Sequence, residues 1–127
     1  MPRTYLVHAT TMPDRDALQG AINALKFKLT LDHGYAPFVT TGYLPCTVEG
    51  EDAGVDLRFD AASADGSQPA CMRVKWGGDP REALCACIIA AAMASGFAAQ
   101  VSDPDKDEAV AVEALLKKAR ALLEDSF

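Results

Sequence analysis

The sequence predicts an α+β fold: one domain in which an antiparallel sheet carries about three helices. Two kinds of spacing predict it, because short stretches alternate apolar and polar residues as strands do, while longer ones repeat apolar residues at helical spacing. Length is the third observation, since 127 residues suit a single hydrophobic core. We therefore expect residues 1–127 to form one domain with its helices on one face of the sheet.

The N-terminal part of the chain predicts a strand and then a helix. Residues 3–9 mix aromatic and β-branched side chains, which favours a strand. A helix is expected over residues 10–34, with Thr11 as its N-cap and Gly34 as its stop. His33 is then expected to cap the carboxyl end of this helix. The predicted buried stripe consists of Leu18, Ile22, Leu25 and Leu29.

The middle of the chain predicts three strands. Gly42 and Pro45 interrupt the strand-like residues 37–50, so we expect this strand at a sheet edge or at a bend. Residues 55–61 and 70–76 alternate cleanly and predict an antiparallel hairpin whose outer faces carry opposite net charge and pair across the strands. The face expected to be buried contains Val55, Leu57, Phe59, Met72, Val74 and Trp76.

A second helix, from Asp79 to Phe97, is expected at the centre of the domain. Asp79 suits the N-cap, Pro80 the first helical position and Glu82 a capping box. The helix is apolar on every side, which is typical of a helix buried all round. An interface between two copies of the chain is the alternative.

The preceding Gly77 and Gly78 raise the question of a phosphate-binding loop. Such a loop points free backbone N–H groups at an anion. Here the Asp79 carboxylate takes the place of the phosphate, and Pro80 removes one of the N–H donors. The sequence therefore favours a simple join between strand and helix.

The C-terminal part predicts a short strand over residues 98–103 and an amphipathic helix over the remaining residues. The expected buried stripe of this helix consists of Val112, Leu115, Ala119 and Leu122, with Leu116 and Leu123 beside it. Acids at positions 103, 105 and 107 match the start of an EF-hand loop. Glu108 stands where that loop needs Gly and Ala114 where it needs Glu, so calcium binding is not expected.

Charge narrows the class of partner. The net charge is −6, and residues 49–70 carry six acidic groups but one basic group. This sign disfavours nucleic acid and anionic membranes, and it favours a basic protein partner. The candidate partner-binding residues are Glu49, Glu51, Asp52, Asp56, Asp60, Asp103, Asp105, Asp107 and Glu108.

Cysteine and histidine usage gives no sign of a metal, a cofactor or a catalytic site. The N-terminus lacks the apolar run of a signal peptide, so we expect a cytoplasmic protein with four reduced, buried thiols. Cys85 and Cys87 lie two apart on a helix, point away from each other and cannot share a metal. No nucleophile elbow or metal motif occurs. An enzyme or ligand site would have to assemble in three dimensions, near His8, Tyr43 or Trp76.

Three structural motifs between Gly42 and Ala94 point to a family. They are the Gly-x-Leu-Pro strand at Gly42, the Gly-x-x-x-Gly turn at Gly50, and the Trp-Gly-Gly-Asp join that leads from Trp76 into an alanine-rich helix. This pattern resembles immunity proteins of bacterial contact-dependent inhibition and related polymorphic toxin systems. The resemblance implies a cytoplasmic, non-enzymatic inhibitor that occludes the active site of one cognate toxin domain.

The leading hypothesis is therefore an immunity protein whose acidic surface neutralises a basic toxin, with a nuclease as the expected activity. Electrostatic steering would speed its association. The alternatives are a small enzyme or ligand-binding domain, and a homodimer or larger homo-oligomer joined through the apolar helix.

Overall fold

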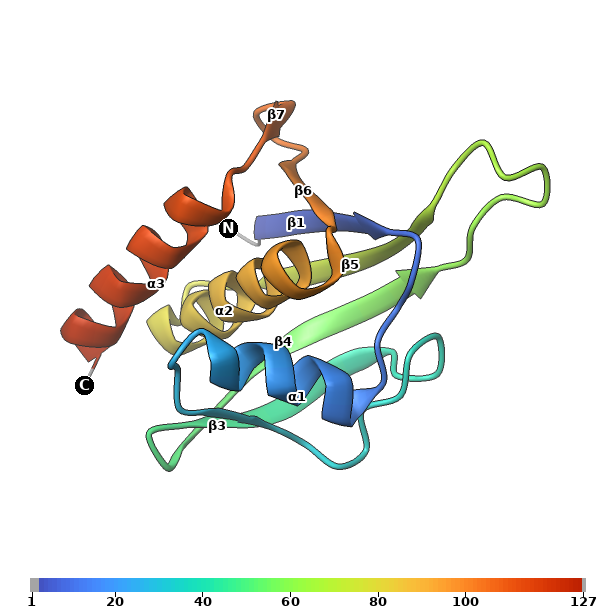
Figure 1. Cartoon of the computed structure of the whole chain (residues 1–127). Coiled ribbons are helices and arrows are strands. Elements are labelled where there is room, and N and C mark those ends of the chain that lie inside the picture. The colour runs from blue at the N-terminus through green and yellow to red at the C-terminus, as the bar shows by residue number, and fades with distance from the viewer. Residues whose placement is uncertain (1–2, 127) are drawn as a thin grey trace.

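The computed structural model describes residues 3–126 and has α+β architecture, with three helices and a seven-stranded sheet (Figure 1). In chain order the elements are β1 (Arg3–Ala9), α1 (Arg15–Ala24), β2 (Leu29–Leu31), β3 (Gly42–Val48), β4 (Glu51–Asp60), β5 (Ala70–Trp76), α2 (Pro80–Phe97), β6 (Gln100–Asp103), β7 (Glu108–Ala109) and α3 (Val112–Ser126).

All paired strands are antiparallel, in the spatial order β2-β3-β4-β5-β1-β6-β7. The predicted hairpin of β4 and β5 is confirmed, with Leu57 opposite Val74 and Asp56 opposite Lys75. The first strand then pairs with β5, which places the N-terminal β1 between two strands from the second half of the chain. The predicted fold class is thus confirmed.

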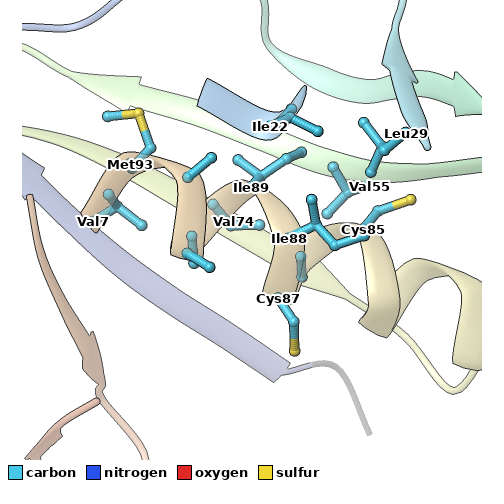
Figure 2. Close-up of a cluster of buried hydrophobic side chains, with 14 of the residues drawn as sticks. Val7, Ile22, Leu29, Val55, Val74, Cys85, Cys87, Ile88, Ile89 and Met93 are labelled. Carbon is cyan, nitrogen blue, oxygen red and sulfur yellow. The ribbon is translucent and has the colours of Figure 1, made fainter. Parts of the chain in front are cut away.

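The helices cover one face of the sheet, and α2 lies at the centre of that layer. It packs against α1, α3 and the strands β1, β3, β4, β5 and β6. Figure 2 shows Val7, Val55 and Val74 of the sheet in one buried cluster with Ile88 and Ile89 of this helix. The alternate strand residues, such as Arg58 and Arg73, are exposed on the other face. We call that uncovered side of the sheet the open face.

The prediction that α2 is buried all round is confirmed. Every residue from Leu84 to Met93 has no measurable exposure. By length and composition the helix could also cross a membrane, a test that core helices pass as well. Because α1, α3 and the sheet already cover these ten residues, they leave no apolar surface through which a second copy could dock.

The start of α2 is built as the sequence predicts, with one difference. The Asp79 carboxylate accepts a hydrogen bond from the Arg81 N–H at 2.9 Å, so Asp79 is the N-cap. The Glu82 carboxylate reaches past the capping-box position and accepts from the Gly77 N–H at 3.2 Å. The two glycines therefore join strand to helix, and the helix terminus is satisfied by the protein's own carboxylates.

The prediction of one helix over residues 10–34 is wrong. The helix begins after Asp14, whose side chain accepts from the Ala17 N–H at 2.9 Å, and ends at Ala24. Lys26 takes a left-handed conformation with φ of 70°, which turns the chain out of the helix. The next apolar residues alternate with a period of two and form β2. His33 consequently lies in a loop after a strand and caps no helix.

The position of one strand in the sheet and the start of the last helix also differ from prediction. The strand with Pro45 is not wholly at an edge, because β2 pairs with its second half, from Cys46 to Val48. Pro45 lies just beyond this ladder and donates no hydrogen bond there, as its missing N–H requires. The last helix begins at Val112, since the acidic residues expected at its start form a turn and β7 instead.

Side chains of α1 form hydrogen bonds with the backbone groups on the outer edge of β2. Gln19 accepts from the Leu31 N–H at 2.8 Å and donates to the Leu29 carbonyl at 2.7 Å. Arg15 donates to the Leu31 carbonyl at 2.9 Å. An exposed edge strand would otherwise present unpaired backbone groups to another chain. Helix α1 therefore closes this edge of the sheet.

Replacing Gln19 with Ala should lower the free energy of unfolding by about 1–3 kcal/mol, because it leaves the Leu31 N–H and the Leu29 carbonyl without their partners. Urea denaturation measures the change. The matched control is Gln68→Ala, whose side chain makes no hydrogen bond within residues 3–126, and it should change stability by less than about 0.5 kcal/mol. Equal midpoints for the two variants would contradict this role of Gln19.

Candidate functional site

The acidic residues predicted around β4 do not form one patch. Glu49 lies in the turn before the strand, with a left-handed φ of 53°. Asp52, Asp56 and Asp60 occupy alternate positions on the open face, while Glu51 points to the helix side. At about 3.4 Å per residue, Asp52 and Asp60 lie about 27 Å apart. The predicted carboxylates are therefore spread along the whole strand and over both faces of the sheet.

Most of these carboxylates also have cationic neighbours. Four ion pairs involve them: Lys28–Glu49 at 3.9 Å, Arg58–Asp56 at 3.6 Å, Arg73–Asp60 at 3.0 Å and Arg81–Glu51 at 3.5 Å. The Arg73–Asp60 pair realises the charge pairing predicted for the β4–β5 hairpin. The pairs are solvent-exposed, and such pairs contribute about 0–1 kcal/mol each. A partner's cations can therefore replace them at little cost.

The second predicted acidic group lies at the opposite edge of the sheet from β2 and β3. Asp103, Asp105, Asp107 and Glu108 belong to the β6–β7 hairpin, and β5 and β1 separate this hairpin from β4. The Asp103 carboxylate accepts from the Asp105 N–H at 3.0 Å. Within residues 3–126 no group of three or more His, Cys, Asp or Glu residues is placed to hold a metal ion. The two predicted groups are therefore separate surfaces.

A groove lies at the corner where β2, β3 and β4 meet. Its volume is about 240 Å³, and it is open to solvent. The open-face side chain of Asp52 lines it together with Asp32 and His33 from the loop after β2. The lining residues are Thr30, Leu31, Asp32, His33, Pro45, Cys46, Thr47 and Asp52. Within residues 3–126 the Asp52 carboxylate forms neither a hydrogen bond nor an ion pair. We call this region, with Glu49 and Glu51 at its margin, the acidic corner.

An exposed tyrosine lies next to the acidic corner. Tyr43 is 60% exposed, and its hydroxyl donates to the Ala53 carbonyl at 2.9 Å. The ring lies over Gly54, where a Cβ would collide with the Tyr43 hydroxyl and would come within 2.8 Å of the Leu44 carbonyl. The missing side chain at Gly54 therefore leaves space for the ring, and the hydrogen bond holds it against the sheet. An exposed aromatic ring fixed in this way suits protein contact.

Asp32 and His33 are the residues of this site that the sequence did not suggest. The helix predicted over residues 10–34 placed both of them at a helix end, far from β4. The signal that could have located them is the alternation of Phe27, Leu29 and Leu31, which is a strand pattern. Once those residues form β2, its pairing with β3 brings the following loop to the acidic corner.

The other residues proposed for a site assembled in three dimensions lie apart from one another. His8 is on the open face of β1, opposite Cys71 of β5 and Gln100 of β6. Trp76 is 5% exposed on the helix side, with its ring centroid 4.7 Å from that of Tyr5. Tyr43 lies on β3, so these three alternative positions for a site are at separate places in the sheet.

A second hollow lies beside α3 on the helix side of the sheet, with a volume of about 430 Å³. We call it the α3 cleft. Its floor contains Tyr5 and Trp76, and Lys118 of α3 lies over both rings, 5.9 Å and 5.5 Å from their centroids. Burial raises the pKa of Tyr5, whose hydroxyl lies 3.9 Å from the Cys87 sulfur, so the phenol stays neutral near pH 7.

The four cysteines are free and buried, as predicted. Figure 2 shows Cys85 and Cys87 pointing to opposite sides of α2. A hydrogen bond with Cys85, together with burial, raises the pKa of Cys46, and burial raises the pKa of Cys71 and of Cys87. These thiols are therefore protonated near neutral pH, whereas nucleophilic cysteines have lowered pKa values.

Comparison with known proteins adds no relative: no protein-family model, no curated protein and no solved structure matches the chain.

The burial and the raised pKa values predict that native cysteines resist thiol reagents. With a disulfide reagent at pH 8, the folded protein should react far more slowly than free cysteine, because all four thiols are buried and the pKa values of Cys46, Cys71 and Cys87 are raised. In denaturant all four should react at once, which provides the control. A thiol in the native protein that reacts as fast as free cysteine would contradict the buried positions.

Proposed function

We propose that this chain is a cytoplasmic immunity protein that binds a basic toxin domain, with a nuclease as the expected activity, and occludes its active site. The observation that carries the proposal is the acidic corner: an open groove lined by Asp52, Asp32 and His33 at one end of an uncovered sheet face. The motifs between Gly42 and Ala94 support the same class. The proposal narrows the predicted acidic surface to one end of β4.

Electrostatics supports a basic partner at this corner. Within residues 3–126 the Asp52 carboxylate is unpaired, and the ion pairs of Glu49 and Glu51, at 3.9 and 3.5 Å, are exposed. A partner's Arg or Lys entering the groove would gain a carboxylate that the chain's own cations do not neutralise. With a net charge of −6, the whole chain also attracts a basic domain over longer distances.

Tyr43 supports a protein partner in preference to a small substrate. The groove by itself is small, and high-affinity protein contacts need a desolvated apolar centre as well as charge. Tyr43 offers such a centre beside Asp52, held by the Ala53 carbonyl and the space above Gly54. In this arrangement acidic residues steer the encounter and the aromatic ring slows dissociation.

The proposal predicts that a neighbouring gene encodes the toxin domain, and the direct test is to identify that domain and to produce it alone and together with the chain. Cells should survive the toxin only when the chain is present, and the two purified proteins should form a stable complex. Toxicity that the chain leaves unchanged, together with no complex between the purified proteins, would refute the proposed function.

Charge reversal at Asp52 should slow association with that toxin. Asp52→Lys is expected to lower the association rate constant about tenfold at low salt, with the difference shrinking as salt screens the charges. Asp125→Lys on α3 makes the same change in net charge away from the corner and should have a much smaller effect. Stopped-flow measurements over a salt series provide the rates. Equal slowing by both variants would assign the effect to net charge and not to the acidic corner.

Replacing Tyr43 with Ala should act on dissociation instead. We expect the dissociation rate constant to rise by about tenfold or more, which corresponds to a loss of at least about 1.4 kcal/mol of binding free energy. Tyr43→Phe keeps the ring and should retain most of the affinity. Surface plasmon resonance separates the two rate constants. Unchanged dissociation for Tyr43→Ala would place the contact elsewhere on the chain.

A further inference from the structure

Three cationic side chains line the α3 cleft, and none of them has an ion-pair partner among residues 3–126. They are Arg3, Lys106 and Lys118. Asp103 and Glu108 line the same cleft, and in the described part of the chain neither forms an ion pair with these cations. In a chain with 12 cationic and 18 acidic residues, three unpaired cations in one hollow mark a site with affinity for anions.

Its walls come from segments distant in the sequence. Arg3 and Tyr5 belong to the first strand and Trp76 to the end of β5, while the β6–β7 hairpin and α3 supply the other sides. The volume of about 430 Å³ falls within the usual range for small-molecule sites, about 300–1,000 Å³. The cleft therefore exists only in the folded chain and has the size of a small metabolite.

Lys118 is the central cation of the cleft. Its ammonium group lies 5.5 Å from the Trp76 ring centroid and 5.9 Å from that of Tyr5, and a cation at such distances is attracted to the ring faces. This contact holds the charge in place without neutralising it, so Lys118 remains able to bind an anion. Arg3 lines the same hollow and adds a planar donor of the kind that pairs with phosphate oxygens.

The other lining residues define what accompanies the anion. The Asp103 and Glu108 carboxylates accept hydrogen bonds, which suits the hydroxyl groups of a sugar. Ala109, Val110 and Ala114 form an apolar wall against which a sugar or base ring can pack. A second hollow of about 330 Å³, past Gly77 and Gly78, shares Arg3, Trp76 and Lys118 with the first and extends the space.

We propose that the α3 cleft binds a small phosphate monoester with a hydroxyl-bearing body, of the sugar phosphate or nucleoside monophosphate class. Lys118 and Arg3 bind the phosphate, and Asp103 and Glu108 accept hydrogen bonds from the hydroxyls. The Gly77–Gly78 join does not bind the phosphate, because Asp79 already caps that helix. The site lies apart from the acidic corner and does not depend on the proposed immunity function.

The sole tryptophan of the chain, Trp76, lies in the floor of the cleft and reports its occupation. Ribose 5-phosphate and adenosine monophosphate are titrated separately while tryptophan emission is recorded, and calorimetry measures both affinities independently. At least one ester should give a saturable change, and the comparison distinguishes a sugar phosphate from a nucleotide. Inorganic phosphate should bind more weakly, and adenosine should not bind.

Lys118→Met keeps an apolar stem over the rings and should weaken ester binding about tenfold, since it removes a charge-assisted contact. The neighbouring Lys117, which does not line the cleft, provides the matched control, and Lys117→Met should keep the affinity within about twofold. Thermal melts check that both variants fold. If Lys118→Met does not fold, Arg3→Gln at the exposed start of β1 tests the same anion contact.

Three results would overturn the proposal. The first is the absence of saturable binding of either ester at millimolar concentration. The second is equal weakening by the Lys117 and Lys118 variants, which would show a general charge effect. The third is inorganic phosphate or adenosine binding as tightly as the esters, which would remove the roles given to the carboxylates or to the cations.

Discussion

The rest of the structure depends on the burial of α2. Residues Leu84 to Met93 carry no polar side chain that can face water, so every side of the helix needs a protein surface against it. The sheet covers one side, and α1 and α3 cover the others. The approach is close where Gly96 meets α1, because a Cβ there would lie 2.9 Å from that of Ala21. One apolar helix thereby fixes the position of the other two.

Gathering α1 and α3 around α2 on one side leaves the opposite face of the sheet uncovered. That face is built from the alternate residues of each strand, most of which, apart from the buried Gly54 and Cys71, are polar, charged or partly exposed. The same asymmetry places the two candidate sites. The acidic corner lies at one end of the open face, and the α3 cleft lies on the helix side, where α3 meets the ends of β1 and β5. Covering one face with all the helices thus places the two candidate sites on opposite sides of the sheet.

The fold was largely predictable because its strongest signals are local. The alternation in β4 and β5, the caps at Asp79 and Pro80, and the all-apolar α2 each appear within a few consecutive residues. The first helix was predicted too long because Leu25 and Leu29 fit helical spacing as well as strand spacing. The left-handed turn at Lys26, which ends the helix, leaves no reliable sign in the sequence, since lysine rarely adopts it.

The sequence by itself determined the central helix, the hairpin beside it, the buried thiols and the acidic composition of the two charged blocks, since each depends on residue type and short-range spacing. Tertiary structure alone decided how those charges are arranged. It divided the acids of β4 between two faces and two ends of a strand, brought Asp32 and His33 to Asp52, and assembled Arg3, Trp76 and Lys118 around one cleft. The physical reason is that such sites join segments far apart in the chain, and only strand pairing and helix packing set the distances between them.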